Sequence, residues 1–338
     1  DTAAANITDL TIKTTGEKST ITTLTAINAK NLTVDAGAEL VISTNTIGTN
    51  SNALETVTVK GTAAVTLGTV ATSNILKSFD ASANKGGVTA TINAATAGSH
   101  ADLKTFVFSA GKDAVTISTQ AINKAINLGA GDDTLVLFAN TTAIPTAAVN
   151  GGAGTDTISM TFTSAASYDA NENLKNAISG FERLEISNAY GTDENNGAGG
   201  AGANTTLTLD MEKLGFNYVI TNGTGISTLQ DRISLTNLAA NATVELNANG
   251  LVIAALKTAT GTADVMNVVT NVTTSAVDFG TFTVASVETV NITANDTQLD
   301  DNSDDVIDSS DIVEVATLNL TADAAKTVNV TGTSSLTL

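Results

Sequence analysis

Short stretches of alternating apolar and polar residues recur along the whole chain. Residues 54–59 read L-E-T-V-T-V, residues 287–292 read V-E-T-V-N-I and residues 315–320 read V-A-T-L-N-L. Period-two alternation puts every second side chain on the same face of a strand. Because several stretches share the spacing apolar-x-x-apolar-x-apolar, we expect them to be equivalent rungs of a parallel ladder.

Helical spacing is confined to two short segments. Residues 170–179, A-N-E-N-L-K-N-A-I-S, predict one short helix, and D-M-E-K-L at residues 210–214 begins a second. The sequence therefore predicts an all-β fold, a parallel β-helix or β-solenoid in one segment or two, with a few short decorating helices.

Glycine-rich turns precede three of the predicted strands. Residues 151–159 read G-G-A-G-T-D-T-I-S, a full match to the calcium-binding nonapeptide G-G-x-G-x-D-x-U-x. Residues 128–136, L-G-A-G-D-D-T-L-V, keep all of this motif except its first glycine. Residues 110–115, A-G-K-D-A-V, keep its central Gly-x-Asp-x-apolar part. Glycine accepts a positive φ, and a carboxylate is the hard oxygen ligand that Ca²⁺ prefers. The candidate ligand turns contain Asp113, Gly129, Gly131, Asp133, Gly152, Gly154 and Asp156.

The three aspartates are 20 and 23 residues apart, whereas tandem nonapeptides would repeat every nine residues. This spacing predicts one turn per coil of a solenoid, with each turn stacked on the next. Sites of this kind take oxygens from two neighbouring turns, so three turns predict two calcium sites between them.

A different calcium signal begins at residue 300 with D-D-N-S-D-D-V-I-D-S-S-D. It resembles the EF-hand loop of dockerin-type modules, with alternate oxygens around the ion. Asp305 stands where that loop has glycine, and the last ligand is aspartate in place of glutamate. The alternative is a solvated acidic loop. The candidate ligands are Asp300, Asn302, Asp304, Val306 through its carbonyl, Asp308 and Asp311.

The composition narrows the class of protein. With 15 basic and 34 acidic residues the formal charge is −19, which argues against nucleic-acid binding. The chain has no cysteine, which excludes disulfides and thiol chemistry, and no apolar run long enough to span a membrane. We expect Ca²⁺ to be the cofactor that relieves the repulsion between carboxylates.

Nothing in the sequence forms a catalytic constellation, and we expect no enzyme activity. The single histidine, His100, lies in S-H-A-D, but a triad needs groups brought together over long range. Glu182, Glu185 and Glu288 fall on outward positions of predicted strands, so we interpret them as solvated charges.

The clearest low-complexity stretch is G-T-D-E-N-N-G-A-G-G-A-G-A-N at residues 191–204. It predicts a loop or linker between two parts. The first part, residues 1–190, holds the aspartate turns. The second, residues 205–338, is a further β-rich segment with the EF-hand-like loop.

The nonapeptide at 151–159, its partial copy at 129–137 and the strands at 261–268 and 284–293 resemble bacterial surface-layer proteins of the RTX group. The acidic, cysteine-free, Thr/Ala/Asn/Val-rich composition extends this resemblance over most of the chain. It implies type I secretion and calcium-dependent assembly of copies of the chain into a lattice on the cell surface. It also implies tethering to lipopolysaccharide or another surface glycan. The alternative is a calcium-stiffened adhesin stalk or the repeat domain of a larger secreted protein.

Overall fold

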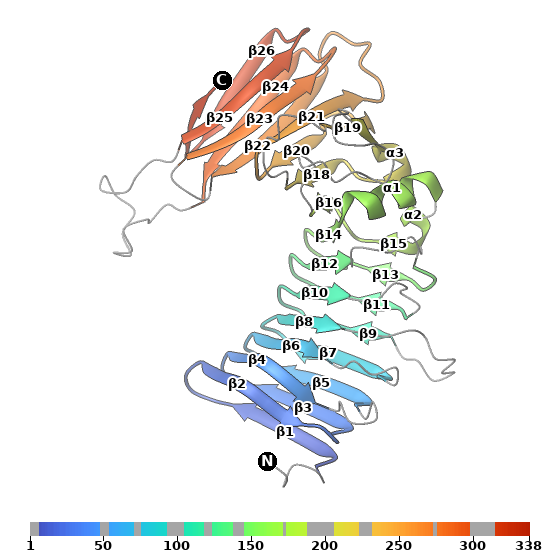
Figure 1. The fold of residues 1–338 in the computed structure, drawn as a ribbon, viewed down its shortest axis with the longest axis vertical. Coiled ribbons are helices and arrows are strands. Elements are labelled where there is room, and N and C mark those ends of the chain that lie inside the picture. The colour runs from blue at the N-terminus through green and yellow to red at the C-terminus, as the bar shows by residue number, and fades with distance from the viewer. Residues whose placement is uncertain are drawn as a thin grey trace, which may run out of the picture. The chain divides into compact units, whose positions relative to one another are not determined.

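The computed structural model describes residues 7–47, 54–70, 76–92, 105–117, 124–137, 145–171, 174–187, 206–222, 232–272, 276–297 and 315–338. The chain divides into two compact units, Asp1–Glu182 and Arg183–Leu338. Within both units the strands coil into a parallel β-solenoid, and short helices occur at only a few points of the described chain (Figure 1). The structure confirms the predicted fold class.

Unit 1 contains two parallel sheets that the chain visits alternately, one strand of each per coil. The first sheet is β1 (Asp9–Thr14), β3 (Asn31–Ala36), β5 (Thr56–Gly61), β7 (Ser78–Asn84), β9 (Phe106–Val107), β11 (Ile126–Asn127), β13 (Val149–Asn150) and β15 (Ile178–Ser179). The second is β2 (Ser19–Ala26), β4 (Leu40–Ile47), β6 (Val65–Val70), β8 (Val88–Ile92), β10 (Ala114–Ile117), β12 (Thr134–Leu137) and β14 (Thr157–Met160).

Unit 2 repeats this arrangement with two further runs of parallel strands. One run is β16 (Arg183–Ile186), β18 (Tyr218–Thr221), β20 (Thr243–Leu246), β22 (Val265–Val272), β24 (Thr289–Asp296) and β26 (Thr327–Gly332). The other is β17 (Thr206–Asp210), β19 (Arg232–Leu238), β21 (Gly250–Leu256), β23 (Ala276–Val284), β25 (Val315–Ala322) and β27 (Ser335–Thr337).

The core is a set of columns in which equivalent inward side chains of successive coils stack on each other. In unit 1, Val115 pairs in register with Leu135, which pairs with Ile158, and all three are fully buried. Val244, Val268 and Ile292 form such a column in unit 2. Burying each aliphatic side chain contributes about 1.5–3 kcal/mol, so every coil stabilises its neighbours.

The helix expected over 170–179 is replaced by two helices, α1 (Phe162–Asn171) and α2 (Leu174–Ala177). The α1 helix begins eight residues before the predicted start. The Thr161 hydroxyl accepts a hydrogen bond from the Ser164 amide (3.3 Å), as an N-cap does. Phe162, Ala165 and Tyr168 are buried at three-residue spacing, and this packing decides where the helix starts.

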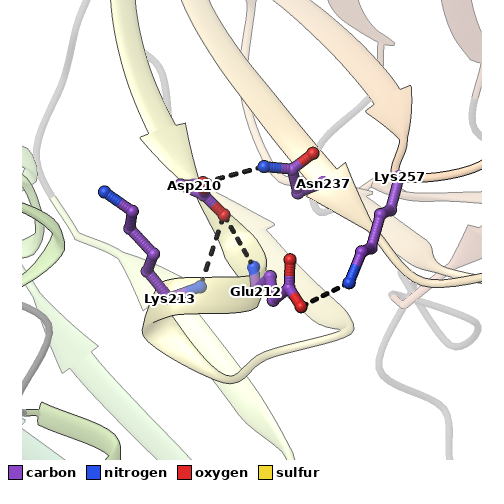
Figure 2. Close-up of polar contacts among 5 residues, drawn as sticks. All are labelled: Asp210, Glu212, Lys213, Asn237 and Lys257. Carbon is purple, nitrogen blue, oxygen red and sulfur yellow. Dashed lines mark hydrogen bonds and ion pairs between the residues drawn. The ribbon is translucent and has the colours of Figure 1, made fainter.

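The second predicted helix is present as α3 (Met211–Leu214), shown in Figure 2. Asp210 caps it, because its Oδ1 accepts from the amides of Glu212 (3.1 Å) and Lys213 (3.3 Å). Asp210 Oδ2 also accepts from Asn237 Nδ2 on β19 (2.8 Å), and Glu212 forms an ion pair with Lys257. A side-chain hydrogen bond and an ion pair thus connect this single helical turn to the following coils.

Candidate calcium turns

Asp113, Asp133 and Asp156 occupy equivalent positions in three successive coils. Each stands immediately before a strand of the second sheet, β10, β12 or β14. Those strands pair in register, Ala114 with Thr134 and Thr134 with Thr157, so the aspartates lie one above another. The sequence spacing of about one coil therefore brings the three predicted ligands into a column.

The glycines of these turns are required by the closeness of the stacked backbones. Gly129, Gly131, Gly152 and Gly154 have φ values of 106°, 126°, 118° and 142°, which L-residues with a side chain rarely adopt. A Cβ on Gly129 would lie 2.0 Å from the Ser109 carbonyl oxygen. On Gly152 it would lie 2.1 Å from the Gly129 carbonyl oxygen, and on Gly154 2.0 Å from that of Gly131.

Main-chain hydrogen bonds join each turn to the next. The Ala153 amide donates to the Gly129 carbonyl (3.0 Å), and the Gly131 amide donates to the Ala153 carbonyl (2.9 Å). A carbonyl oxygen has two lone pairs, so each of these acceptors keeps capacity for a cation. The turns that carry the carboxylates thus also carry carbonyl oxygens with a free lone pair.

The carboxylates form a ladder in which each accepts a hydrogen bond from the main chain of the preceding coil. Asp133 Oδ1 accepts from the Asp113 amide (2.7 Å), and Asp156 Oδ1 accepts from the Asp133 amide (2.9 Å). At the start of the ladder, Asp113 accepts from the Val88 amide (2.6 Å). All three aspartates are at most 1% exposed.

The three aspartates differ in what remains of their hydrogen-bonding capacity. Both oxygens of Asp113 are engaged, because Ser109 donates its amide to Oδ2 (2.9 Å) and its hydroxyl to Oδ1 (2.7 Å). The Oδ2 atoms of Asp133 and Asp156 are buried and have no hydrogen-bond partner within the described part of the chain. A buried carboxylate oxygen without a donor is costly, and a hard cation would satisfy it.

Burial dominates the electrostatics of the column. It raises the pKa of Asp113 to about 6 despite the hydrogen bonds from Ser109 and Val88. Burial, together with the negative charges of Asp113 and Asp156, raises the pKa of Asp133 to about 7. Burial also raises the pKa of Asp156, and Glu182 adds to this effect. Without a cation, this column opposes its own ionisation.

The residues at Asp133 and Asp156 fit a calcium ion in donor chemistry, because each has one unpartnered carboxylate oxygen and stands in a turn with main-chain carbonyl oxygens. No group of three or more His, Cys, Asp or Glu side chains with a metal-binding arrangement occurs in the described ranges. A cation there would therefore rely on carbonyl oxygens for most of its coordination. The ligands predicted between Asp300 and Asp311 lie outside the described residues, as does His100.

Glu182 is a member of the ladder that the sequence interpretation missed. Its Oε2 accepts from the Asp156 amide (2.8 Å), and its own amide donates to the Asp156 carbonyl (3.0 Å). In unit 2, Glu288 makes the same two contacts with Asp264. Its Oε2 accepts from the Asp264 amide (3.0 Å), and its own amide donates to the Asp264 carbonyl (3.1 Å). Their role goes beyond that of solvated charges. The signal was the recurrence of an apolar-Glu-x-apolar strand 24 or 26 residues after a turn aspartate.

The predicted linker at 191–204 also lies outside the described residues, and the two compact units meet in sequence at 182/183. No helix of the described chain is long and apolar enough to cross a membrane. A comparison with protein-family models and with curated proteins finds no match to this chain.

Proposed function

We propose that this chain is a structural component of a bacterial surface layer, which folds and assembles with copies of itself when calcium binds. The observation that carries the proposal is the buried aspartate column, with an unpartnered oxygen on Asp133 and on Asp156. The proposal adds secretion to the cell surface and attachment to a surface glycan, which the resemblance to RTX surface-layer proteins implies. It assigns no catalytic activity to the chain.

The proposed mechanism couples metal binding to folding. Where calcium is scarce, the chain must fold with buried carboxyl groups that resist ionisation at neutral pH. Where calcium is abundant, Asp133 and Asp156 would each offer Oδ2, together with carbonyls of their own and adjacent turns. Bound calcium would neutralise this column and hold neighbouring coils together. A ligand at a hundredfold above its Kd stabilises the folded state by about 3 kcal/mol per site.

The direct test is thermal unfolding of the 338-residue chain at pH 7.5, in millimolar calcium and in EDTA, with magnesium as the control cation. We expect calcium to raise the melting temperature and magnesium to do so much less. Identical unfolding in calcium and EDTA would contradict the proposal.

Electron microscopy of the same samples separates the remaining possibilities. Calcium-dependent two-dimensional sheets are expected of a surface-layer protein. Extended particles that stay monomeric in calcium would favour the adhesin stalk or the repeat domain of a larger secreted protein.

A further inference from the structure

The second sheet of unit 1 has an unusual distribution of charge. None of the residues of β2, β4, β6, β8, β10, β12 or β14 is Asp, Glu, Lys or Arg, although charged residues make up 14% of the chain. These seven strands are consecutive neighbours in the sheet (Figure 1), so no charged strand residue interrupts it from β2 to β14.

The outward positions of this sheet carry mainly threonine, arranged in columns. Thr66 pairs in register with Thr89, and Thr91 pairs with Thr116. We define the threonine face as the outward side of this sheet; its central side chains are Thr66, Thr89, Thr91, Thr116, Thr134 and Val136, all exposed or half-buried.

The first sheet of the same unit provides the contrast. Outward positions of its first four strands include Asp9 and Lys13 on β1, Asp35 on β3, Lys60 on β5 and Asp80 on β7, whereas its last four strands are two residues long and uncharged. Lys13 and Lys60 both lie close to Asp35, with N···O distances of 3.8 and 3.7 Å. Charged outward side chains of this kind keep sheets from stacking on one another. The threonine face lacks that protection.

From this contrast we infer that the threonine face is a contact surface between two copies of the chain. Each copy carries a formal charge of −19, so most faces of two copies repel each other. On the threonine face, two copies meet without burying or opposing any charged strand residue. Two such sheets can then pack about 10 Å apart, with threonine methyl and hydroxyl groups between them.

The size of the face predicts how strong the contact is. Six strands, β2 to β12, spaced about 4.8 Å apart and each of four to eight residues, give on the order of 500 Å² per copy, and β14 is left out because its outward Ser159 is buried. Stable interfaces bury about 800 Å² per partner, so we expect a weak contact that matters when it is repeated. The inference rests on the assembly part of the proposed function and assigns one of its contacts to a surface.

The test compares two double variants of the 338-residue chain with the parent by sedimentation velocity over a wide concentration range. The first, Thr91→Glu with Thr116→Glu, places two adjacent carboxylates on the threonine face. The matched control is Thr33→Glu with Thr58→Glu on β3 and β5. All four threonines are half-buried, and both pairs are in register on neighbouring strands. Both variants change the net charge equally, and circular dichroism establishes that each is folded.

We expect the parent and the control to self-associate as concentration rises, and the Thr91/Thr116 variant to lose at least tenfold in association constant. Sodium chloride should maintain or strengthen association of the parent, because salt screens repulsion between the acidic copies. Equal association of the two variants would overturn the inference, as would a parent that is monomeric at every concentration. The latter result would leave the face to another partner, such as a neutral glycan.

These failures are distinct from a failure of the proposed function. If the Thr91/Thr116 variant forms calcium-dependent sheets as well as the parent does, the face is wrong and the function stands. If the parent associates through the face but folds and assembles identically in EDTA, the calcium-dependent function is wrong and the face stands.

Discussion

At the scale of single residues, the two carboxylate oxygens of Asp133 lie in different environments. Its Oδ1 holds the amide of the preceding coil, while its Oδ2 is buried without a donor. Its neighbours in the column are two further carboxyl groups, and its pKa is raised to about 7. Replacement of this residue should therefore affect the calcium-free and calcium-bound states in opposite ways.

We expect Asp133→Asn to leave the calcium-free protein as stable or more stable, because the amide oxygen still accepts the hydrogen bond and no charge is buried. The same substitution should remove most of the rise in melting temperature that calcium produces. Asp80→Asn is the control, since Asp80 is exposed on β7 and its carboxylate accepts hydrogen bonds only from Ser82 among the described contacts. A normal calcium response in Asp133→Asn would contradict the proposed role of this residue.

The pH dependence of the calcium-free protein follows from the raised pKa values. Asp113 and Asp133 have folded-state pKa values of about 6 and 7, above their ordinary value of 3.8. The folded state therefore binds more protons than the unfolded state between pH 4 and 7. Their contribution to stability is fully present below pH 4 and is lost as pH rises through 6 to 7.

In EDTA, the free energy of unfolding measured with urea should therefore rise as pH is lowered from 8 to 5. In calcium this trend should flatten or reverse, because protons compete with the cation for the carboxylates. A calcium-free protein that loses stability over the same interval would show that the aspartate column is already ionised.

At the scale of elements, the turns and strands depend on different residues. The strands are held by columns of small aliphatic side chains, which tolerate exchange among similar residues. The turns are held by glycines whose missing side chain lets one backbone lie against the next. Gly152 combines a positive φ of 118° with a close backbone contact, because a Cβ there would lie 2.1 Å from a carbonyl oxygen of the neighbouring turn.

Gly152→Ala should therefore cost on the order of 3–5 kcal/mol of unfolding free energy, as expected when a core contact must move. Gly16→Ala separates the two causes, because Gly16 has a φ of 84° but nothing within 4 Å of its Cβ position. That control should cost only about 1–2 kcal/mol, the strain of left-handed backbone. Urea unfolding in calcium measures both, and equal losses would argue against close stacking of the turns.

At the scale of the whole molecule, the candidate calcium turns within the described residues all belong to unit 1. Asp113, Asp133 and Asp156 all lie before residue 183, whereas each unit has aliphatic columns of its own. Removal of calcium should therefore loosen one unit much more than the other. The EF-hand-like sequence at 300–311 follows β24, so the earlier strands of unit 2 provide the better internal reference.

Amide hydrogen exchange can follow this difference peptide by peptide. In EDTA we expect exchange to speed up in β10, β12 and β14, because the repelling carboxylates open these coils locally. Exchange in β18 and β20 should change little. Uniform loosening of all strands would instead indicate that the two units unfold together.

The sequence by itself determined the repeating element, because period-two alternation and positive-φ glycines act within a few residues. It predicted several of the strands, the glycine turns and the α3 helix. The tertiary structure decided which groups meet, since that depends on coils of 20, 23 and 26 residues coming into register. This register leaves Asp133 and Asp156 with an unpartnered oxygen, engages both oxygens of Asp113, and makes Glu182 the last rung of the ladder. It also gathers seven uncharged strands into the threonine face, which no local pattern reveals.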